Sequence, residues 1–407
     1  MAVKDASAEK TMPIEESSAV ELLIGVTGDV NPVDLRSRVT AALAASGLPD
    51  GVAEQVVVSW PGVESATMEP GKNGQPAMIP YQPGATHEAG PWAQISGAQQ
   101  GVLALAAELK AQACVVMDAD MGLLKAGGLR DLVAPVMDRQ CELVMPIYAL
   151  HRYEGLLNTA MLAPLVRALY CKRIEMPLAL DFAVSQRYAE RISATGNRGI
   201  LWPSITAARE TMQVGQVHLS VHHQTPMEGV DLTAVLTQIG GSLFQEVEQT
   251  AAVWQRGRSA QATPVWGQAG AVEDPGEAIE VRSMIESFQL AVRNLDELWQ
   301  LVLPPVTLLE LKHLARSAPE NFRMADRLWA RIVYDFALAH RLRAISRTHL
   351  MGALTPLYLG WVASYVLEIS EMQAEQVTQR QDQLARAFEE NKPYLVSRWR
   401  WPDRFNP

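Results

Sequence analysis

The sequence predicts an α/β domain with a mostly parallel sheet, followed by an α-helical region. Short apolar runs alternate with helical patterns up to about residue 260, an order typical of a parallel sheet covered by helices. After a polar, glycine-containing segment at 257–276, every apolar pattern has the period of an amphipathic helix. With 407 residues, 48% hydrophobic and 20% charged, the chain is long enough for two folded domains.

The N-terminal elements follow from short apolar runs. Residues 1–18 carry no such run and are expected to form a flexible leader rather than a secretory signal. The run at 19–28 stops at a glycine and predicts a first strand, and helical spacing over 32–47 predicts a helix. The run at 54–60 predicts a second buried strand, so the order strand–helix–strand favours parallel pairing.

A long segment rich in glycine and proline, 61–94, is expected to be a functional or disordered loop. Four segments after it are predicted, in order, as helix, strand, helix and strand: 97–112, 113–117, 129–140 and 142–150. The strand 113–117 ends in two aspartates separated by one residue, Asp118 and Asp120. We expect both at the carboxyl end of a sheet strand, where open α/β sheets bind their ligands.

Helical patterns dominate the rest of the chain. They are expected over 155–171, from Asp181 onward with this aspartate as the N-cap, and as one long helix over 230–256. Five further amphipathic helices are predicted: 278–303, 306–317, 324–345, 350–369 and 373–391. The apolar helix 350–369 is long enough to span a membrane, but Pro356 interrupts it, so we interpret it as a buried helix and expect no transmembrane segment.

Charge and cysteine content argue against several classes of protein. The net charge of -10 argues against a nucleic-acid binder, which needs a basic face. The three cysteines are far apart in sequence, which favours free thiols in a reducing, cytoplasmic compartment. The sequence contains no phosphate-binding Walker loop, no dinucleotide-binding glycine fingerprint and no serine-hydrolase elbow.

The Asp118–Asp120 pair has two interpretations. Two carboxylates this close cannot easily both ionise unless a cation joins them, and Mg²⁺ or Mn²⁺ commonly bridges such carboxylates to substrate phosphates. Bound in this way, a metal neutralises a diphosphate as it leaves. The alternative is a solvated turn after a strand, since the tripeptide alone is a weak signal.

Several segments, in the same order along the chain, resemble the GT-A glycosyltransferases close to glucosyl-3-phosphoglycerate synthase and mannosylglycerate synthase. They include ELKAQACVVMDADM, ELVMPIYALHRYEGLLNTAMLAPLVRALYCKRIEMPLALDFAVS, ILWPSITAARETMQVGQVHLSVHHQTP and LARAFEENKPYLVSRW. The resemblance is strongest from 104 to 256. It implies a GT-A domain over 19–260, an α-helical domain over 277–407 with room for a homodimer, and metal-dependent transfer of a hexose. The implied donor is a nucleotide diphosphate sugar, and the acceptor is small and anionic, like a glycerate.

The resemblance also assigns the donor and metal residues. Asp118 would face the sugar or the ribose, and Asp120 would bind Mg²⁺ or Mn²⁺ directly. A histidine would complete the metal site, and the spacing to the following VDL segment favours His223 over His222. Neutral imidazole is a reasonable ligand for Mn²⁺.

Three further residues are assigned through the resemblance. Asp181, in MPLALDFAVS, holds the acidic position beside donor sugar and acceptor and would be catalytic, a role compatible with its alternative as a helix N-cap. Gly97 and Trp202 would contact the donor.

The sequence departs from the family at three polar positions. Trp60 replaces an aspartate, the segment with Ile95 and Gln100 replaces a basic turn, and Ile200 replaces an acidic residue. Each lost polar anchor is worth about 1.5–3 kcal/mol. The alternative function is therefore a non-catalytic relative with a degenerate donor site, acting as a binding or scaffolding subunit.

Overall fold

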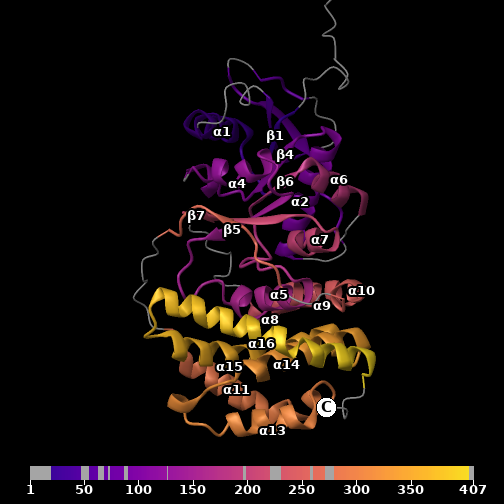
Figure 1. Cartoon of the computed structure of the whole chain (residues 1–407), viewed down its shortest axis with the longest axis vertical. Coiled ribbons are helices and arrows are strands. Elements are labelled where there is room, and N and C mark those ends of the chain that lie inside the picture. Colours follow the sequence, from indigo (N-terminus) through magenta and orange to yellow (C-terminus); the bar gives the residue numbers. More distant parts are fainter. Residues whose placement is uncertain are drawn as a thin grey trace, which may run out of the picture.

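An eight-stranded sheet forms the first part of the molecule (Figure 1). The computed structural model describes residues 20–46, 55–62, 68–71, 74–86, 90–125, 127–195, 199–220, 231–256, 260–270 and 279–402. The strands are β1 Leu22–Val26, β2 Val56–Pro61, β3 Ala77–Tyr81, β4 Ala113–Met117, β5 Leu143–Tyr148, β6 Phe182–Ser185, β7 Val214–Leu219 and β8 Val265–Trp266.

The strand order is β3-β2-β1-β4-β6-β5-β7-β8. All neighbouring strands pair in parallel except at β6, which runs antiparallel to both β4 and β5. Ile24 of β1 lies between Val58 of β2 and Val115 of β4. The predicted α/β class with a mostly parallel sheet, followed by helices, is therefore confirmed.

Helices cover both faces of this sheet. On one face, Leu22 and Ile24 of β1 share an apolar core with helices α1 (Pro32–Ser46) and α4 (Gly128–Met137). On the other face, Leu23 packs with α2 (Pro91–Glu108) and α6 (Gln186–Thr195). Side chains alternate between the two faces of a strand, so a continuous apolar run such as β1 serves both layers. Figure 1 shows these helices on either side of the strands.

Two of the remaining helices also pack at the sheet: α3 Gly122–Lys125 beside α1 and α4, and α7 Pro203–Arg209 beside β5. The others form a second body of helices below the sheet (Figure 1). They are η3 Asn158–Leu162, α5 Ala163–Tyr170, α8 Leu232–Val235, η4 Leu236–Gly240, α9 Gly241–Gln249, α10 Ala251–Trp254, α11 Val281–Asn294, α12 Asp296–Gln300, α13 Pro305–Leu314, η5 Pro319–Asn321, α14 Asp326–Leu342, α15 Arg347–Ile369 and α16 Ala374–Arg400. Most of them share one apolar core, to which α5 and α9 contribute together with α14, α15 and α16. The predicted domain boundary near residue 260 stays a prediction, because elements on both sides of it build this core.

Two local predictions were wrong. The helix expected to begin at Asp181 is instead strand β6 followed by α6 from Gln186, because Phe182–Ser185 pairs with β4 and β5 in the buried sheet. The segment 61–94, expected to be a loop, contains β3 and the start of α2. In both cases pairing with distant strands overrides the local pattern.

Helix α15 is the apolar segment that resembled a membrane span. By length and composition it is the one described helix that could cross a membrane, and 78% of its most apolar window is buried inside the protein. Tyr358, Trp361 and Tyr365 of this helix pack in the helical core, where Trp361 stacks between Trp329 and Tyr365. This burial agrees with the interpretation as a core helix.

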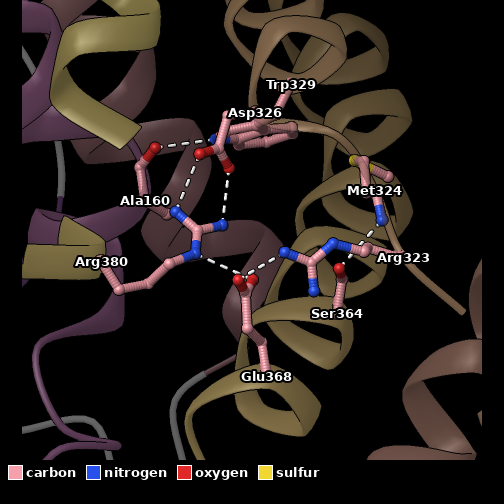
Figure 2. A network of polar contacts seen from close by, with 8 residues as sticks. All are labelled: Ala160, Arg323, Met324, Asp326, Trp329, Ser364, Glu368 and Arg380. Carbon is pink, nitrogen blue, oxygen red and sulfur yellow. Dashed lines mark hydrogen bonds and ion pairs between the residues drawn. The ribbon is translucent and has the colours of Figure 1, made fainter. Parts of the chain in front are cut away.

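A buried network of ion pairs joins the last three helices (Figure 2). Arg380 of α16 donates from both terminal nitrogens to Asp326 of α14, at 2.7 and 2.8 Å. Its Nε lies 2.8 Å from Glu368 of α15, and Arg323 donates to the other oxygen of Glu368. The Arg380 side chain is only 6% exposed. The guanidinium is therefore held between two carboxylates that have little access to water.

We predict that Arg380→Met lowers the free energy of unfolding by about 3–5 kcal/mol, because it leaves the shielded Asp326 carboxylate without its cation and Glu368 with Arg323 alone. Urea unfolding followed by circular dichroism measures this change. The matched control is Arg282→Met, which breaks an ion pair whose partners are 80% and 65% exposed and should cost less than about 1 kcal/mol. Equal effects of the two substitutions would contradict the assigned role of Arg380.

Candidate functional site

The two aspartates lie in a tight turn at the carboxyl end of β4. Met121 follows them with φ +53, in the left-handed region, and its N–H donates to the carbonyl of Asp118 at 3.1 Å. The N–H of Gly122 donates to Oδ1 of Asp120 at 2.8 Å. Asp118 is partly buried and Asp120 is exposed. The predicted position of the pair at a strand end is confirmed.

The side chain of Asp181 accepts a hydrogen bond from the backbone of this turn. It is 1% exposed, and its Oδ1 accepts the backbone N–H of Asp118 at 2.9 Å. Its Oδ2 accepts the hydroxyl of Tyr148, the last residue of β5, at 2.8 Å. Asp181 and Asp118 thus meet, as the sequence suggested, but through the backbone of Asp118. In this position Asp181 orients the turn; its predicted catalytic contact with a substrate stays a prediction.

Tyr148 and Asp181 bond to each other twice. Besides donating to Asp181 Oδ2, the Tyr148 oxygen accepts the N–H of Asp181 at 3.1 Å. Burial and the neighbouring carboxylates of Asp181 and Asp118 raise the pKa of Tyr148 well above its ordinary value. The phenol therefore stays protonated and available as a donor at neutral pH.

The Asp118–Asp120 turn lies at the topological switch point of the sheet, where strand order reverses. From β1 the chain adds β2 and β3 on one side and β4 on the other, and such reversals are where open α/β sheets bind ligands. Thr27, just after β1, donates its N–H to the carbonyl of Met117 at 2.9 Å. A Cβ on Gly28 would come within 2.5 Å of the Ala119 Cβ. The loop after β1 therefore packs directly on the aspartate turn.

The carboxylates of Asp118 and Asp120 offer hard oxygen ligands, which suit Mg²⁺ or Mn²⁺. Within the described residues, no group of three or more His, Cys, Asp or Glu side chains is placed to hold a metal ion. The predicted ligand His223, and its alternative His222, lie outside the described residues. The residues present fit a cation that takes one or two carboxylates and completes its shell with phosphate oxygens and water.

Gly97 and Trp202, predicted to contact the donor, lie in well-packed surroundings. Gly97 accepts the N–H of Gly84 at 2.7 Å, and a Cβ at Gly97 would meet the Gly84 oxygen at 2.7 Å. Trp202 is 1% exposed and donates its indole N–H to Ser242 at 3.1 Å. Both residues thus have structural roles that explain them, and their contact with a donor stays a prediction.

Trp60, Ile95 and Ile200, the positions where the sequence differs from the enzymes it resembles, are apolar and packed. Ile200 is 2% exposed in the helical core, and Ile95 packs against the same core. Trp60, at the end of β2, packs against the core beneath α1. Gln100 donates to the carbonyl of Gly199 at 3.1 Å. These side chains therefore contribute to packing within the fold.

A cleft of about 750 Å³ opens beside Tyr148. Its walls come from the carboxyl ends of β5 and β7, the loop 149–155, the start of η3, the segment 262–270 and helix α16. The cleft thus lies between the sheet and the C-terminal helices. Through Tyr148 and Asp181 it is connected to the aspartate turn by two hydrogen bonds.

The sequence interpretation missed Tyr148, Thr27 and the cleft. Tyr148 carries the same signal as Asp118, a polar side chain at the carboxyl end of an apolar run, and could have been found by it. The cleft residues come from four separate stretches of the chain, so no local signal unites them.

No protein-family model matches the sequence, and no curated protein matches it. Among solved structures, glucosyl-3-phosphoglycerate synthase from Mycobacterium tuberculosis with Mg²⁺ and uridine diphosphate is similar at a TM-score of 0.34 and 16% identity, over 58% of this chain and 84% of that chain. The same enzyme with Mn²⁺, uridine-diphosphate-glucose and phosphoglyceric acid gives 0.30 and 14%, over 59% and 85%. Similarity this distant carries no argument about function.

We predict that Tyr148→Phe lowers the free energy of unfolding by about 1.5–3 kcal/mol, because the buried Asp181 carboxylate loses one of its donors. Chemical unfolding of the full chain measures the change. Tyr153→Phe is the matched control, since Tyr153 is also partly buried near the cleft and should change stability by less than about 0.5 kcal/mol. If both substitutions cost the same, the Tyr148–Asp181 pair does not support the turn.

Proposed function

We propose that this protein is a metal-dependent glycosyltransferase that binds a nucleotide diphosphate sugar at the Asp118–Asp120 turn. One observation carries the proposal: a buried carboxylate, Asp181, holds the turn from beneath at the reversal point of the sheet. Burying a carboxylate costs stability. A turn with no role other than to connect two elements in solvent would not require a buried carboxylate to fix its backbone. The resemblance of the sequence to GT-A enzymes supports the same assignment.

In the proposed reaction the sugar moves to a hydroxyl of an acceptor. The hydroxyl oxygen forms a bond to the anomeric carbon, and the bond from that carbon to the diphosphate breaks. The electron pair leaves with the diphosphate, and the hydroxyl proton passes to a diphosphate oxygen. The contribution of the protein is to position the two substrates and to supply a negative field for the positive charge that develops on the sugar.

Asp120 and His223 are the proposed protein ligands of Mg²⁺ or Mn²⁺, and Asp118 is proposed to face the sugar or the ribose. The bound ion would neutralise charge on the diphosphate. Asp181 is proposed to act by positioning Asp118, in addition to any contact with the substrates. Direct contacts of Gly97 and Trp202 with the donor, a homodimer and a cytoplasmic location remain predictions.

A small, anionic, glycerate-like acceptor also remains a prediction. It is based on the sequence resemblance. The second solved structure above contains phosphoglyceric acid, but that fact concerns the enzyme from M. tuberculosis alone.

A second candidate function is a non-catalytic subunit with a degenerate donor site. The specific observation in its favour is that Trp60, Ile95 and Ile200 are packed apolar residues where related enzymes have polar anchors. Such a protein would keep the fold and lose affinity for the nucleotide sugar.

We expect Mn²⁺ together with one of a panel of GDP-, UDP- and ADP-sugars to raise the melting temperature of the full chain, because a ligand that binds only the native state stabilises it. Asp120→Asn should weaken this donor binding at least about tenfold, since even the indirect partners of a metal ligand are worth that much. Thermal-shift titrations with and without Mn²⁺ measure both effects.

The matched control is Asp138→Asn, which removes an exposed carboxylate at the other end of α4 and should leave the titration unchanged. No response of the wild-type chain to any donor, with or without the metal, would favour the non-catalytic function. A donor response that Asp120→Asn leaves intact would show that the metal assignment is wrong.

A further inference from the structure

We infer that the cleft beside Tyr148 binds a neutral, polyhydroxylated molecule, such as a saccharide, as the acceptor of the proposed transfer. The role of this ligand as the acceptor rests on the proposed function. Its chemical class follows from the residues that line the cleft. It differs from the anionic acceptor that the sequence resemblance implied.

Two of the three arginines in the cleft wall are engaged within the protein. Arg152 donates from Nη1 to the carbonyl oxygens of Ile369 and Met372, at 3.2 and 2.9 Å, where α15 ends. Arg167 pairs with two carboxylates of α16, Asp382 and Glu389. Arg167 is therefore neutralised by two carboxylates, and one terminal nitrogen of Arg152 is engaged with the end of α15, which leaves fewer donors for an anionic ligand.

The remaining charges in the wall balance each other. Arg173 is exposed at the cleft, and Glu175 follows it two residues later in the same segment. Gln216 fixes this segment, since its side chain donates to the carbonyl of Arg173 and accepts the N–H of Glu175. Glu154 is a further carboxylate of the wall. The lining as a whole therefore contains three arginines, Arg152, Arg167 and Arg173, and three carboxylates, Glu154, Glu175 and Asp382, so these groups give no net positive charge to attract a phosphate or carboxylate.

Uncharged hydrogen-bonding groups surround the same space. Asn158, Thr159 and Thr263 line the cleft from two different parts of the chain. The Oδ1 of Asn158 is shielded from solvent and has no hydrogen-bond partner among the described residues. Asn158 is also the first residue of the π-helical turn η3, a geometry that is rare and often found at functional sites. An unpaired buried acceptor is the group that a ligand hydroxyl would satisfy.

The size of the cleft agrees with this class of ligand. Its volume of about 750 Å³ lies within the range of sites for molecules of drug size, which is about 300–1,000 Å³. A three-carbon acid would fill only a small part of this volume, whereas a disaccharide would occupy more of it. The walls also include the apolar side chains of Ile147, Leu150 and Val377, which can pack on the faces of sugar rings.

The test measures binding to the full chain without metal or donor. Saturation-transfer NMR with glucose, mannose, maltose, trehalose and sucrose, each at millimolar concentration, is compared with 3-phosphoglycerate. We expect binding of at least one neutral saccharide and weaker or no binding of 3-phosphoglycerate. Preference for the acid, or no binding of any saccharide, would overturn the inference.

The variant Asn158→Leu tests the site itself. It removes the unpaired oxygen and nearly keeps the side-chain volume, so we expect an unchanged or raised melting temperature but at least about tenfold weaker saccharide binding. Asn294→Leu, at an exposed position at the end of α11, is the control and should leave binding unchanged. Unaltered affinity of Asn158→Leu would overturn the assignment.

These results separate the two proposals. Saccharide binding without a thermal response to any nucleotide sugar would contradict the proposed transferase function and support the saccharide site in the cleft. A response to a nucleotide sugar without saccharide binding would support the transferase function and contradict the saccharide site.

Discussion

The buried carboxylate of Asp181 is the interaction on which the proposed site depends. It is nearly inaccessible to solvent, yet it accepts hydrogen bonds from the backbone of Asp118 and from Tyr148. Because removing a carboxylate from water is costly, these donors are required where it lies. Three strand ends meet at this point: β4 brings the turn, β5 brings Tyr148, and β6 begins directly after Asp181. The antiparallel course of β6 is what places Asp181 under the carboxyl end of β4.

A second set of buried charges organises the C-terminal helices. Arg380 joins α14, α15 and α16 through two carboxylates, and Arg167 ties α5 to α16. The Arg167 pairs also affect the cleft, because Arg167 lies in its wall and a guanidinium engaged with carboxylates has few donors left for a ligand. The contacts that bring α16 to the cleft thus also neutralise one of the arginines in its wall.

The two candidate functions differ in what the packed positions mean. Apolar residues at 60, 95 and 200 pack in or against the surrounding cores, and none of them carries a charge that could hold a phosphate. Two features could still bind a ligand: the Asp118–Asp120 turn, whose backbone is fixed by Asp181, and the cleft beside Tyr148. An enzyme could use them with a donor held mainly through its diphosphate, whereas a binding subunit would use the cleft alone.

The sequence by itself determined the class of fold, the strand that carries Asp118 and Asp120, and the helical nature of the last third of the chain. These features follow from the spacing of apolar residues along the chain, which can be read from the sequence without knowledge of distant contacts. It did not reveal that Phe182–Ser185 is a strand, because that segment owes its conformation to pairing with β4 and β5. Tertiary structure alone decided that Asp181 bonds to the backbone of Asp118, that Trp202 is buried, and that Asn158 and Thr263 line one cleft. Such contacts join residues dozens of positions apart, and only the packing of the folded chain brings them together.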